Sequence, residues 1–161
     1  MPGGTSVMSE NLDELYRDIL MEHYRFPRGS KILDDPDIEN EGKNPSCGDE
    51  IDIQLKITDN TVKSIGVHCA GCAISVASGS MLAELVEGKS LPEVKKIARA
   101  VKALLKNEKI EDDIDLGDLK ALEGVKKFPV RIKCALLSWT TLIDALESHR
   151  SNAEAKISTT E

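Results

Sequence analysis

The chain has 161 residues, a length that suits one ordinary domain with a single hydrophobic core. Its hydrophobic residues, 40% of the total, occur in short periodic runs, and none approaches the roughly 20 apolar residues that cross a bilayer, so no membrane-spanning segment is expected. The net charge of -7 argues against a nucleic-acid binder, because phosphate recognition depends on an excess of Lys and Arg.

The two ends of the chain, residues 1–8 and 150–161, are small, polar and aperiodic. They are predicted to be flexible tails on either side of a single domain over 9–149. The first residues lack the charged start and apolar block of a signal peptide, so a cytoplasmic location is expected. In that compartment the four cysteines indicate metal or sulfur chemistry before disulfides.

The first predicted helix begins at Asn11, where Asn11 and Glu14 are placed as an N-cap and its capping-box partner, and it ends before Pro27. His23 lies on the apolar stripe of this helix, where a packing role is favoured over a role as a metal ligand. Two acidic stretches further along, 34–41 and 111–118, are interpreted as solvated loops or faces.

Two adjacent segments carry the signals of a β-hairpin. Residues 50–57 alternate between apolar and polar side chains, which is the period of a half-buried strand. A tight turn then leads into a second strand over 62–69, so the pair is predicted to be antiparallel. Cys69 continues the phase of the inward-pointing Ile65 and Val67, which favours a role as a small packing residue.

Four helical segments follow the hairpin and complete an α+β order; one of them is a short piece around 119–122. Residues 73–86 are rich in small side chains, so this helix can approach its neighbours closely. Ser90 and Glu93 form a capping box for the next helix. Pro129 suits the first turn of a last helix that runs to about Glu147.

Three cysteines lie at the ends of separate elements. Cys47 precedes the first predicted strand, and Gly48 leaves the backbone free to bring Asp49 to the same cation. Cys72 falls where strand gives way to helix, so the positive end of the helix dipole favours its thiolate. Together with the third cysteine of this kind, Cys134, they could form a tetrahedral Cys3Asp zinc site, although spacing alone does not show whether they meet.

Cys134 lies early in the last helix, beside a basic cluster that is expected to favour its thiolate as well. The cluster consists of Lys126, Lys127, Arg131 and Lys133. A solvated helix face explains Arg131 and Lys133 about as well as a role in steering an anionic sulfur group.

Cys69 and Cys72 have CxxC spacing, which opens two further interpretations. A zinc ribbon expects a second CxxC or paired His residues, and the sequence contains neither. A thioredoxin-like motif expects a βαβ crossover, whereas the strand before this motif is part of a hairpin. A thiol-disulfide oxidoreductase therefore remains only as an alternative, for which Cys69 would be essential.

Four stretches carry a resemblance to a known family, the U-type iron-sulfur cluster assembly proteins (IscU/NifU N-terminal family), within which the chain is most similar to the SufU-like branch. They are LYRDILMEHYRFPR at 15–28, NPSCGD at 44–49, GCAISVASGSMLAELVEGK at 71–89 and FPVRIKCALLSW at 128–139. The resemblance implies a small antiparallel sheet with helices packed on one side. It also implies that one exposed site binds Zn2+ or, alternatively, a transient [2Fe-2S] cluster. The residues it assigns to that site are Cys47, Asp49, Cys72 and Cys134.

Two features favour the SufU-like branch over the IscU-type scaffolds. The position before the third cysteine of the motif, a His in IscU-type proteins, is Lys133 here, and the Leu-Pro-Pro-Val-Lys tag of those proteins is absent. The segment from 88 to 107 also resembles the insertion that distinguishes SufU-like proteins.

The resemblance implies a zinc-dependent sulfur acceptor that takes persulfide sulfur from a SufS-like cysteine desulfurase and passes it to downstream iron-sulfur assembly proteins. Cys47 is the predicted acceptor, because its loop contains Gly48. Such a protein is a sulfurtransferase-type carrier rather than a multiple-turnover enzyme on a free small substrate. Two alternatives stay open, a scaffold on which a [2Fe-2S] cluster is assembled and a zinc-stapled adaptor without sulfur-transfer activity.

Overall fold

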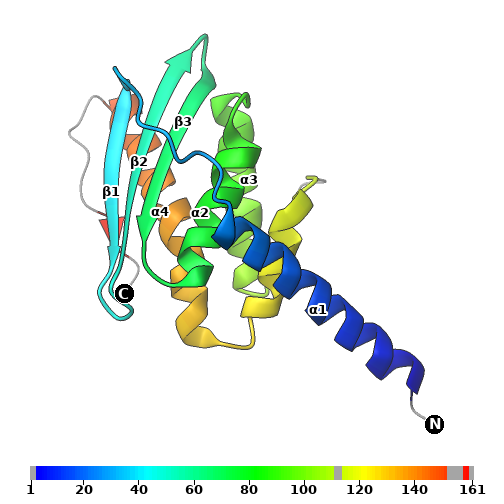
Figure 1. Cartoon of the computed structure of the whole chain (residues 1–161). Coiled ribbons are helices and arrows are strands. Elements are labelled where there is room, and N and C mark those ends of the chain that lie inside the picture. The colour runs from blue at the N-terminus through cyan, green and yellow to red at the C-terminus, as the bar shows by residue number, and fades with distance from the viewer. Residues whose placement is uncertain (1–2, 111–113, 152–157, 160–161) are drawn as a thin grey trace.

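The computed structural model describes residues 3–110, 114–151 and 158–159, which form a sheet and a set of helices (Figure 1). In chain order the elements are α1 (Gly3–Arg25), β1 (Ile38–Asn44), β2 (Asp49–Thr58), β3 (Thr61–Ala70), α2 (Ala73–Val86), α3 (Leu91–Leu105), the 3-10 helix η1 (Gly117–Val125), α4 (Pro129–Ser151) and β4 (Ser158–Thr159).

The sheet has the strand order β3-β2-β1-β4, in which β1, β2 and β3 are antiparallel and the short β4 runs parallel to β1. Helices α2 and α4 pack against one face of the sheet, while the segment 26–37 crosses part of the opposite face (Figure 1). The predicted α+β fold, a small antiparallel sheet with helices on one side, is therefore confirmed. No helix among the described residues is long and apolar enough to cross a membrane.

The predicted hairpin is present as β2 and β3. Asp59 and Asn60 at its tip have φ values of 51° and 60°, the left-handed conformation that a tight two-residue hairpin turn requires. The apolar positions of β2, Ile51, Ile53 and Leu55, are buried under α2 and α4, as their alternation predicts.

Strand β1 was not predicted from the sequence, although the acidic side chains of the stretch 34–41 are solvated as expected. Residues 38–44 alternate strictly between buried and exposed positions, and Glu39 and Glu41 are on the exposed face. The inward positions include Asn40 and Asn44, so the strand buries few apolar side chains. The apolar–polar alternation that reveals a strand in sequence is therefore missing.

The helices after the hairpin agree with the prediction, and α1 differs in its start. In α3 the Ser90 hydroxyl caps the helix by accepting a hydrogen bond from the Glu93 amide. Helix α1 begins at Gly3, so Asn11 lies inside it and is not its cap; residues 5–10 contain no proline or glycine to stop the helix from extending.

The predicted tails overlap these elements only in part. Residues 3–8 belong to α1, and in the C-terminal stretch 150–151 end α4 and 158–159 form β4. The other residues of the two predicted tails lie outside the described residues, as do 111–113 of the second acidic stretch.

His23 is a packing histidine, as its place on the apolar stripe predicts. Its ring is fully buried between α1, α2 and η1. The nitrogen Nδ1 lies 2.7 Å from Ser80 Oγ, and Nε2 lies 2.9 Å from Asp118 Oδ2. Both ring nitrogens thus have partners that tie the three helices together.

Candidate metal centre

The cysteines of the motif and Asp49 lie at one end of the sheet, each supplied by a different element. Cys47 is in the turn between β1 and β2, where Gly48 has a φ of 73°, and Asp49 is the first residue of β2. Cys72 is the N-cap residue of α2, and Cys134 is in α4 near its start. Segments that are far apart in sequence therefore meet here.

The ligand atoms of Cys47, Asp49 and Cys134 all lie within 4.8 Å of one another. The sulfurs of Cys47 and Cys134 are 3.4 Å apart. Cys72 is at the edge of this group, with its sulfur 3.9 Å from Asp49 Oδ2. The structure thus brings together three of the predicted site residues closely and places the fourth in contact with them.

The Asp49 carboxylate is buried and held by several donors. Its Oδ1 accepts from the backbone amide of Cys72 at 2.8 Å, and its Oδ2 accepts from the Ser75 hydroxyl at 2.6 Å. Burial raises the pKa of Asp49, but hydrogen bonds from Ser75, the Cys72 amide, Cys134 and Asn44 outweigh it and hold the pKa below its ordinary value. Asp49 is therefore a carboxylate anion in the site, placed at the positive end of α2.

Gly71 allows the Asp49 carboxylate to lie close to the backbone before α2. A side chain at this position would collide with the Asp49 carboxylate, because a Cβ built on Gly71 falls on its oxygen and carbon atoms. The residue before the helix cap must therefore be glycine for Asp49 to reach the Cys72 amide.

The surroundings of Cys134 do not favour its thiolate, contrary to the expectation from the sequence. Its side chain is fully buried, and burial, together with hydrogen bonds to Cys47, Asp49 and Cys72, raises the pKa of its thiol. Lys133 is exposed on the surface of α4, and the charge of Arg131 acts on Cys72 more than on Cys134, so the basic cluster does not offset this rise in the pKa of Cys134. The Cys134 thiolate therefore depends on a bound cation rather than on neighbouring lysines.

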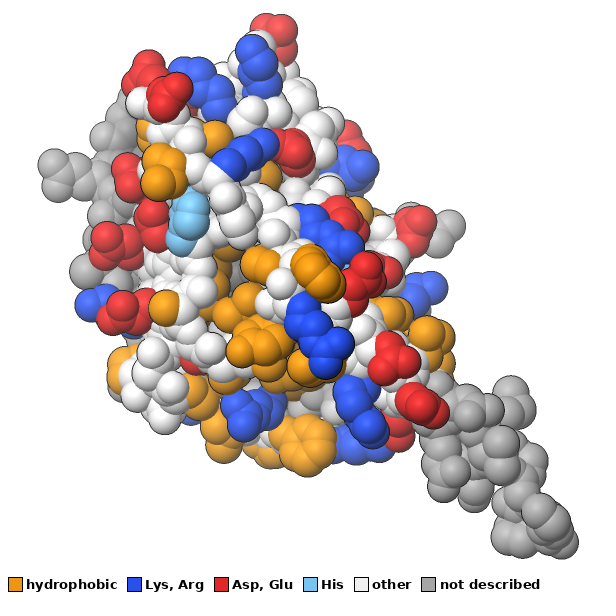
Figure 2. Space-filling view, viewed as in Figure 1, with side chains coloured by type: hydrophobic (Ala, Val, Ile, Leu, Met, Phe, Trp, Pro, Cys, Tyr) orange, Lys and Arg blue, Asp and Glu red, His pale blue; other side chains and the backbone are white. Residues whose placement is uncertain are grey.

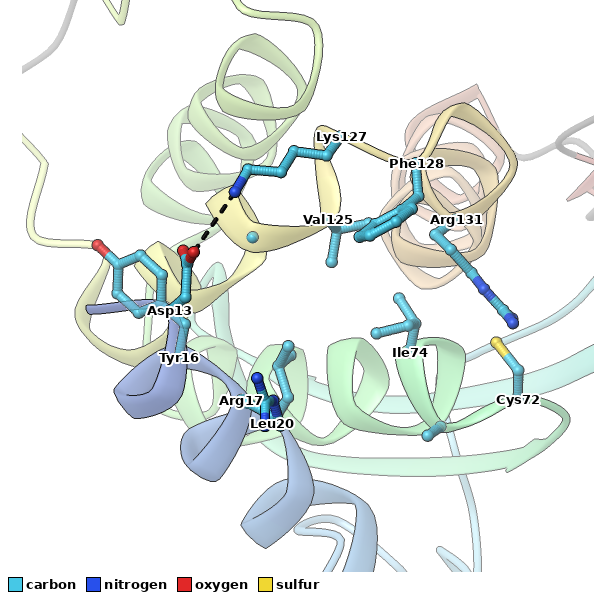
Figure 3. A pocket seen from close by; sticks show the side chains of 12 residues that line it. Asp13, Tyr16, Arg17, Leu20, Cys72, Ile74, Val125, Lys127, Phe128 and Arg131 are labelled. Atoms are coloured by element: carbon cyan, nitrogen blue, oxygen red, sulfur yellow. Dashed lines mark hydrogen bonds and ion pairs between the residues drawn. The ribbon is translucent and has the colours of Figure 1, made fainter. Parts of the chain in front are cut away.

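Arg131 interacts chiefly with Cys72 and, more weakly, with Cys134. Figure 3 shows its guanidinium pointing toward the Cys72 sulfur, and the pKa of Arg131 is raised chiefly by the charge of Cys72 and by a hydrogen bond to it. The positively charged guanidinium of Arg131 therefore lies beside the Cys72 sulfur.

Two cavities open next to the site on the surface. One of about 540 Å³ is lined by Cys47, Cys72 and the residues 127–131. A second, of about 670 Å³, includes Cys72 in its lining, together with the apolar side chains of Leu20, Ile74 and Phe128 (Figure 3). The space-filling view shows hydrophobic side chains flanked by Lys and Arg on this face (Figure 2). Cys47 and Cys72 therefore face open space, whereas Cys134 does not.

Cys69 packs against the core and is half-buried, in agreement with its phase along β3. Burial raises the pKa of its thiol to about 12, and the nearby charges of Asp49 and Cys72 act in the same direction. A thiol of this kind is unreactive at neutral pH, which argues against the oxidoreductase alternative.

The residues present fit a zinc ion. A tetrahedral zinc with bonds to sulfur of about 2.3 Å holds its ligand sulfurs about 3.8 Å apart. The sulfurs of Cys47 and Cys134 come within a few tenths of an ångström of that separation. Three thiols and one ionised carboxylate are also a donor set that zinc accepts.

Two residues around the site were not found by the sequence analysis. Ser75 is one of the small residues of α2, and Asn44 ends a strand that was not predicted. Neither had a signal of its own, because their roles depend on the position of Asp49, which only the fold supplies.

The chain is similar to known proteins over most of its length. The model of the NifU-like N terminal domain matches residues 15–135. The chain is 41% identical to the zinc-dependent sulfurtransferase SufU of Bacillus subtilis (strain 168), over 82% of this chain and 89% of the relative. It is 32% identical to the iron-sulfur cluster assembly scaffold protein IscU of Thermotoga maritima, over 83% of this chain and 93% of the relative.

Solved structures show the same fold. A protein of Fervidobacterium islandicum AW-1, assigned as an iron-sulfur cluster assembly scaffold for the SUF system, matches with a TM-score of 0.75 at 28% identity, over 80% of this chain and 93% of that one. A NifU-like N-terminal domain from Brucella abortus matches with a TM-score of 0.78 at 23% identity, over 88% of this chain and 98% of that one, which bears on the fold alone.

Proposed function

The chain belongs to the family of NifU-like N-terminal domains, and from that premise we propose that it is a zinc-dependent sulfur acceptor for iron-sulfur cluster assembly. Its donor would be a SufS-like cysteine desulfurase, and its acceptors would be the downstream assembly proteins, in the cytoplasm. The similarity to the Bacillus zinc-dependent sulfurtransferase supports this activity over that of the scaffold relatives, since the identity is higher, 41% against 32%.

The observation that carries the proposal is the meeting of three thiols and one ionised carboxylate beside an open surface cavity. Cys47, Asp49, Cys72 and Cys134 would hold the metal. When bound, zinc would keep the sulfurs deprotonated and lower their reactivity until one of them is released.

Cys47 is the proposed sulfur acceptor. It is half-buried and lines the cavity of about 540 Å³, whereas Cys134 is fully buried. The sulfur of the alternative acceptor, Cys72, interacts with Asp49, Ser75 and Arg131. Cys47 also lies in a turn rather than in a helix or strand, so its sulfur can move away from the site with the least disturbance of the fold.

The transfer is a thiol exchange that needs no oxidant. The Cys47 thiolate attacks the outer sulfur of the donor's persulfide and forms a new sulfur–sulfur bond, while the donor's own sulfur–sulfur bond breaks. The electron pair of the broken bond leaves on the donor's cysteine as a thiolate. Arg131 supplies a positive charge at the mouth of the site, where an anionic persulfide would approach.

The experiment is intact-mass analysis after incubation with a cysteine desulfurase and cysteine. Wild-type protein should gain sulfur on Cys47, in steps of one sulfur atom that a reductant removes. Cys47→Ser should lose this gain. Sulfur that still loads at the full rate on the variant would move the acceptor role to Cys72 or Cys134.

A scaffold function is the second candidate, because several relatives are IscU scaffold proteins. The same four side chains would then hold a [2Fe-2S] cluster. Anaerobic purification separates the two functions, since tightly bound zinc supports the carrier and a coloured iron-sulfur product supports the scaffold.

A further inference from the structure

Asn44, the last residue of β1, lies against three of the four proposed ligand residues, and its side chain is fully buried. Its Nδ2 donates to Cys134 Sγ at 3.6 Å, and its side chain also hydrogen-bonds the Asp49 carboxylate. Its backbone oxygen accepts from the amides of Cys47 at 3.2 Å and Gly48 at 2.9 Å. One residue thus contacts the turn, the carboxylate and the buried sulfur of the site.

The nitrogen and the oxygen of the Asn44 carboxamide have different surroundings. Its nitrogen faces the Cys134 sulfur and the Asp49 carboxylate, whereas its oxygen is buried with no hydrogen-bond partner among the described residues. Buried polar atoms are nearly always paired, so an unpaired one calls for an explanation. An apolar side chain of the same shape would fill this space without leaving an unpaired atom. Folding alone therefore does not account for an asparagine here.

We propose that Asn44 is a positioning residue of the metal centre. Its N–H groups orient the Cys134 sulfur and the Asp49 carboxylate as ligands and stabilise their negative charge. This inference rests on the proposed zinc-dependent function and adds to it a difference between the sulfurs. The hydrogen bond from Asn44 fixes the position of the buried Cys134 sulfur and lowers its nucleophilicity, so Cys134 remains a ligand while Cys47 exchanges.

The test is Asn44→Leu, which keeps the branching of the side chain and removes both donors. Zinc affinity, measured by competition with a chromophoric chelator, should fall by about 10- to 100-fold, as is usual when a partner of a metal ligand is lost. The melting temperature of the metal-free protein should stay the same or rise, because the unpaired oxygen is gone. A purely structural asparagine would give the opposite pair of results.

Asn40→Leu is the matched control. Asn40 is also buried on the inward face of β1, but its Nδ2 donates to the backbone oxygen of Thr141 at 3.0 Å, away from the metal ligands. This variant should lower the melting temperature and leave zinc affinity unchanged. If leucine at 44 prevents folding, Asn44→Ala removes the donors without added bulk and is measured in the same competition.

Equal zinc affinity in wild type and the Asn44 variant would overturn the inference and leave the proposed function standing. An affinity loss of the same size in Asn40→Leu would also overturn it, because the loss would then come from damage to β1. Wild-type protein that binds no zinc would overturn the proposed function, and the inference with it.

Discussion

Asp49 is a candidate ligand and at the same time the acceptor that secures the start of α2. Its two oxygens take hydrogen bonds from the Cys72 amide and the Ser75 hydroxyl, so the carboxylate acts as a cap although it lies 23 residues before the N-cap position. The metal centre and the helix therefore share one side chain.

Asp49→Ala should weaken zinc binding and also destabilise the metal-free protein. The loss of the cap should lower the free energy of unfolding by about 1 kcal/mol, the usual value for removing an N-cap acceptor. Asp49→Asn is the matched control, because its amide oxygen can still accept from the Cys72 amide. It should recover part of the stability in urea denaturation while zinc dialyses away more readily than from wild type.

The two cysteines of the CxxC spacing should respond differently to serine. Cys69 packs against the core with a raised pKa, whereas Cys72 contacts Asp49. Cys69→Ser should therefore keep stoichiometric zinc, and Cys72→Ser should lose it in dialysis against a mild chelator. Full loss of zinc or sulfur loading in Cys69→Ser would show that both sulfurs act together.

At the scale of elements, prediction from the sequence succeeded where the apolar pattern is complete. The alternation in 50–57 and the capping box at Ser90 and Glu93 place β2 and α3 correctly. Strand β1 was missed because two of its inward side chains are asparagines and a third position is Gly42, which lies against Thr141. These residues serve the close packing of β1 on α4 rather than a hydrophobic face.

A substitution in the cap of helix α3 tests whether the stability of the fold and zinc binding are independent. Ser90 caps α3 and lines neither of the cavities beside the ligands. Ser90→Ala should lower the free energy of unfolding by about 1 kcal/mol, as a shift of the denaturation midpoint. Zinc content and sulfur loading should match wild type; a fall in either would mean that α3 is coupled to the site.

At the scale of the whole molecule, the site depends on contacts that sequence spacing does not encode. Cys47 and Cys134 are 87 positions apart and meet because β1 and α4 pack together, which places the turn after β1 beside the start of α4. The sequence pattern identified each cysteine as the end of an element. Only the family resemblance implied that they converge, because packing between distant elements cannot be computed from local periodicity.

Removal of zinc should leave the fold intact. The core around Trp139, Ile53 and Leu82 is fully buried between the sheet and the helices, and the proposed ligand residues are not part of this hydrophobic cluster. Far-UV circular dichroism should therefore be retained after chelation, whereas the melting temperature should rise with added zinc, by mass action. At a free zinc concentration of 1,000 times the dissociation constant the gain is about 4 kcal/mol. Unfolding on chelation would instead favour the zinc-stapled adaptor.

The bond between the Cys72 amide and Asp49 Oδ1 has a spectroscopic consequence. The Cys72 amide nitrogen lies 2.8 Å from the carboxylate oxygen, so the resonance of its proton is displaced downfield by that charge. When the carboxylate gives electron density to a cation, the displacement shrinks. The proton shift of the Cys72 cross-peak in a nitrogen–proton correlation spectrum should therefore report whether a cation occupies the site. It can be followed while a partner protein is added, and the sulfurs need no added label.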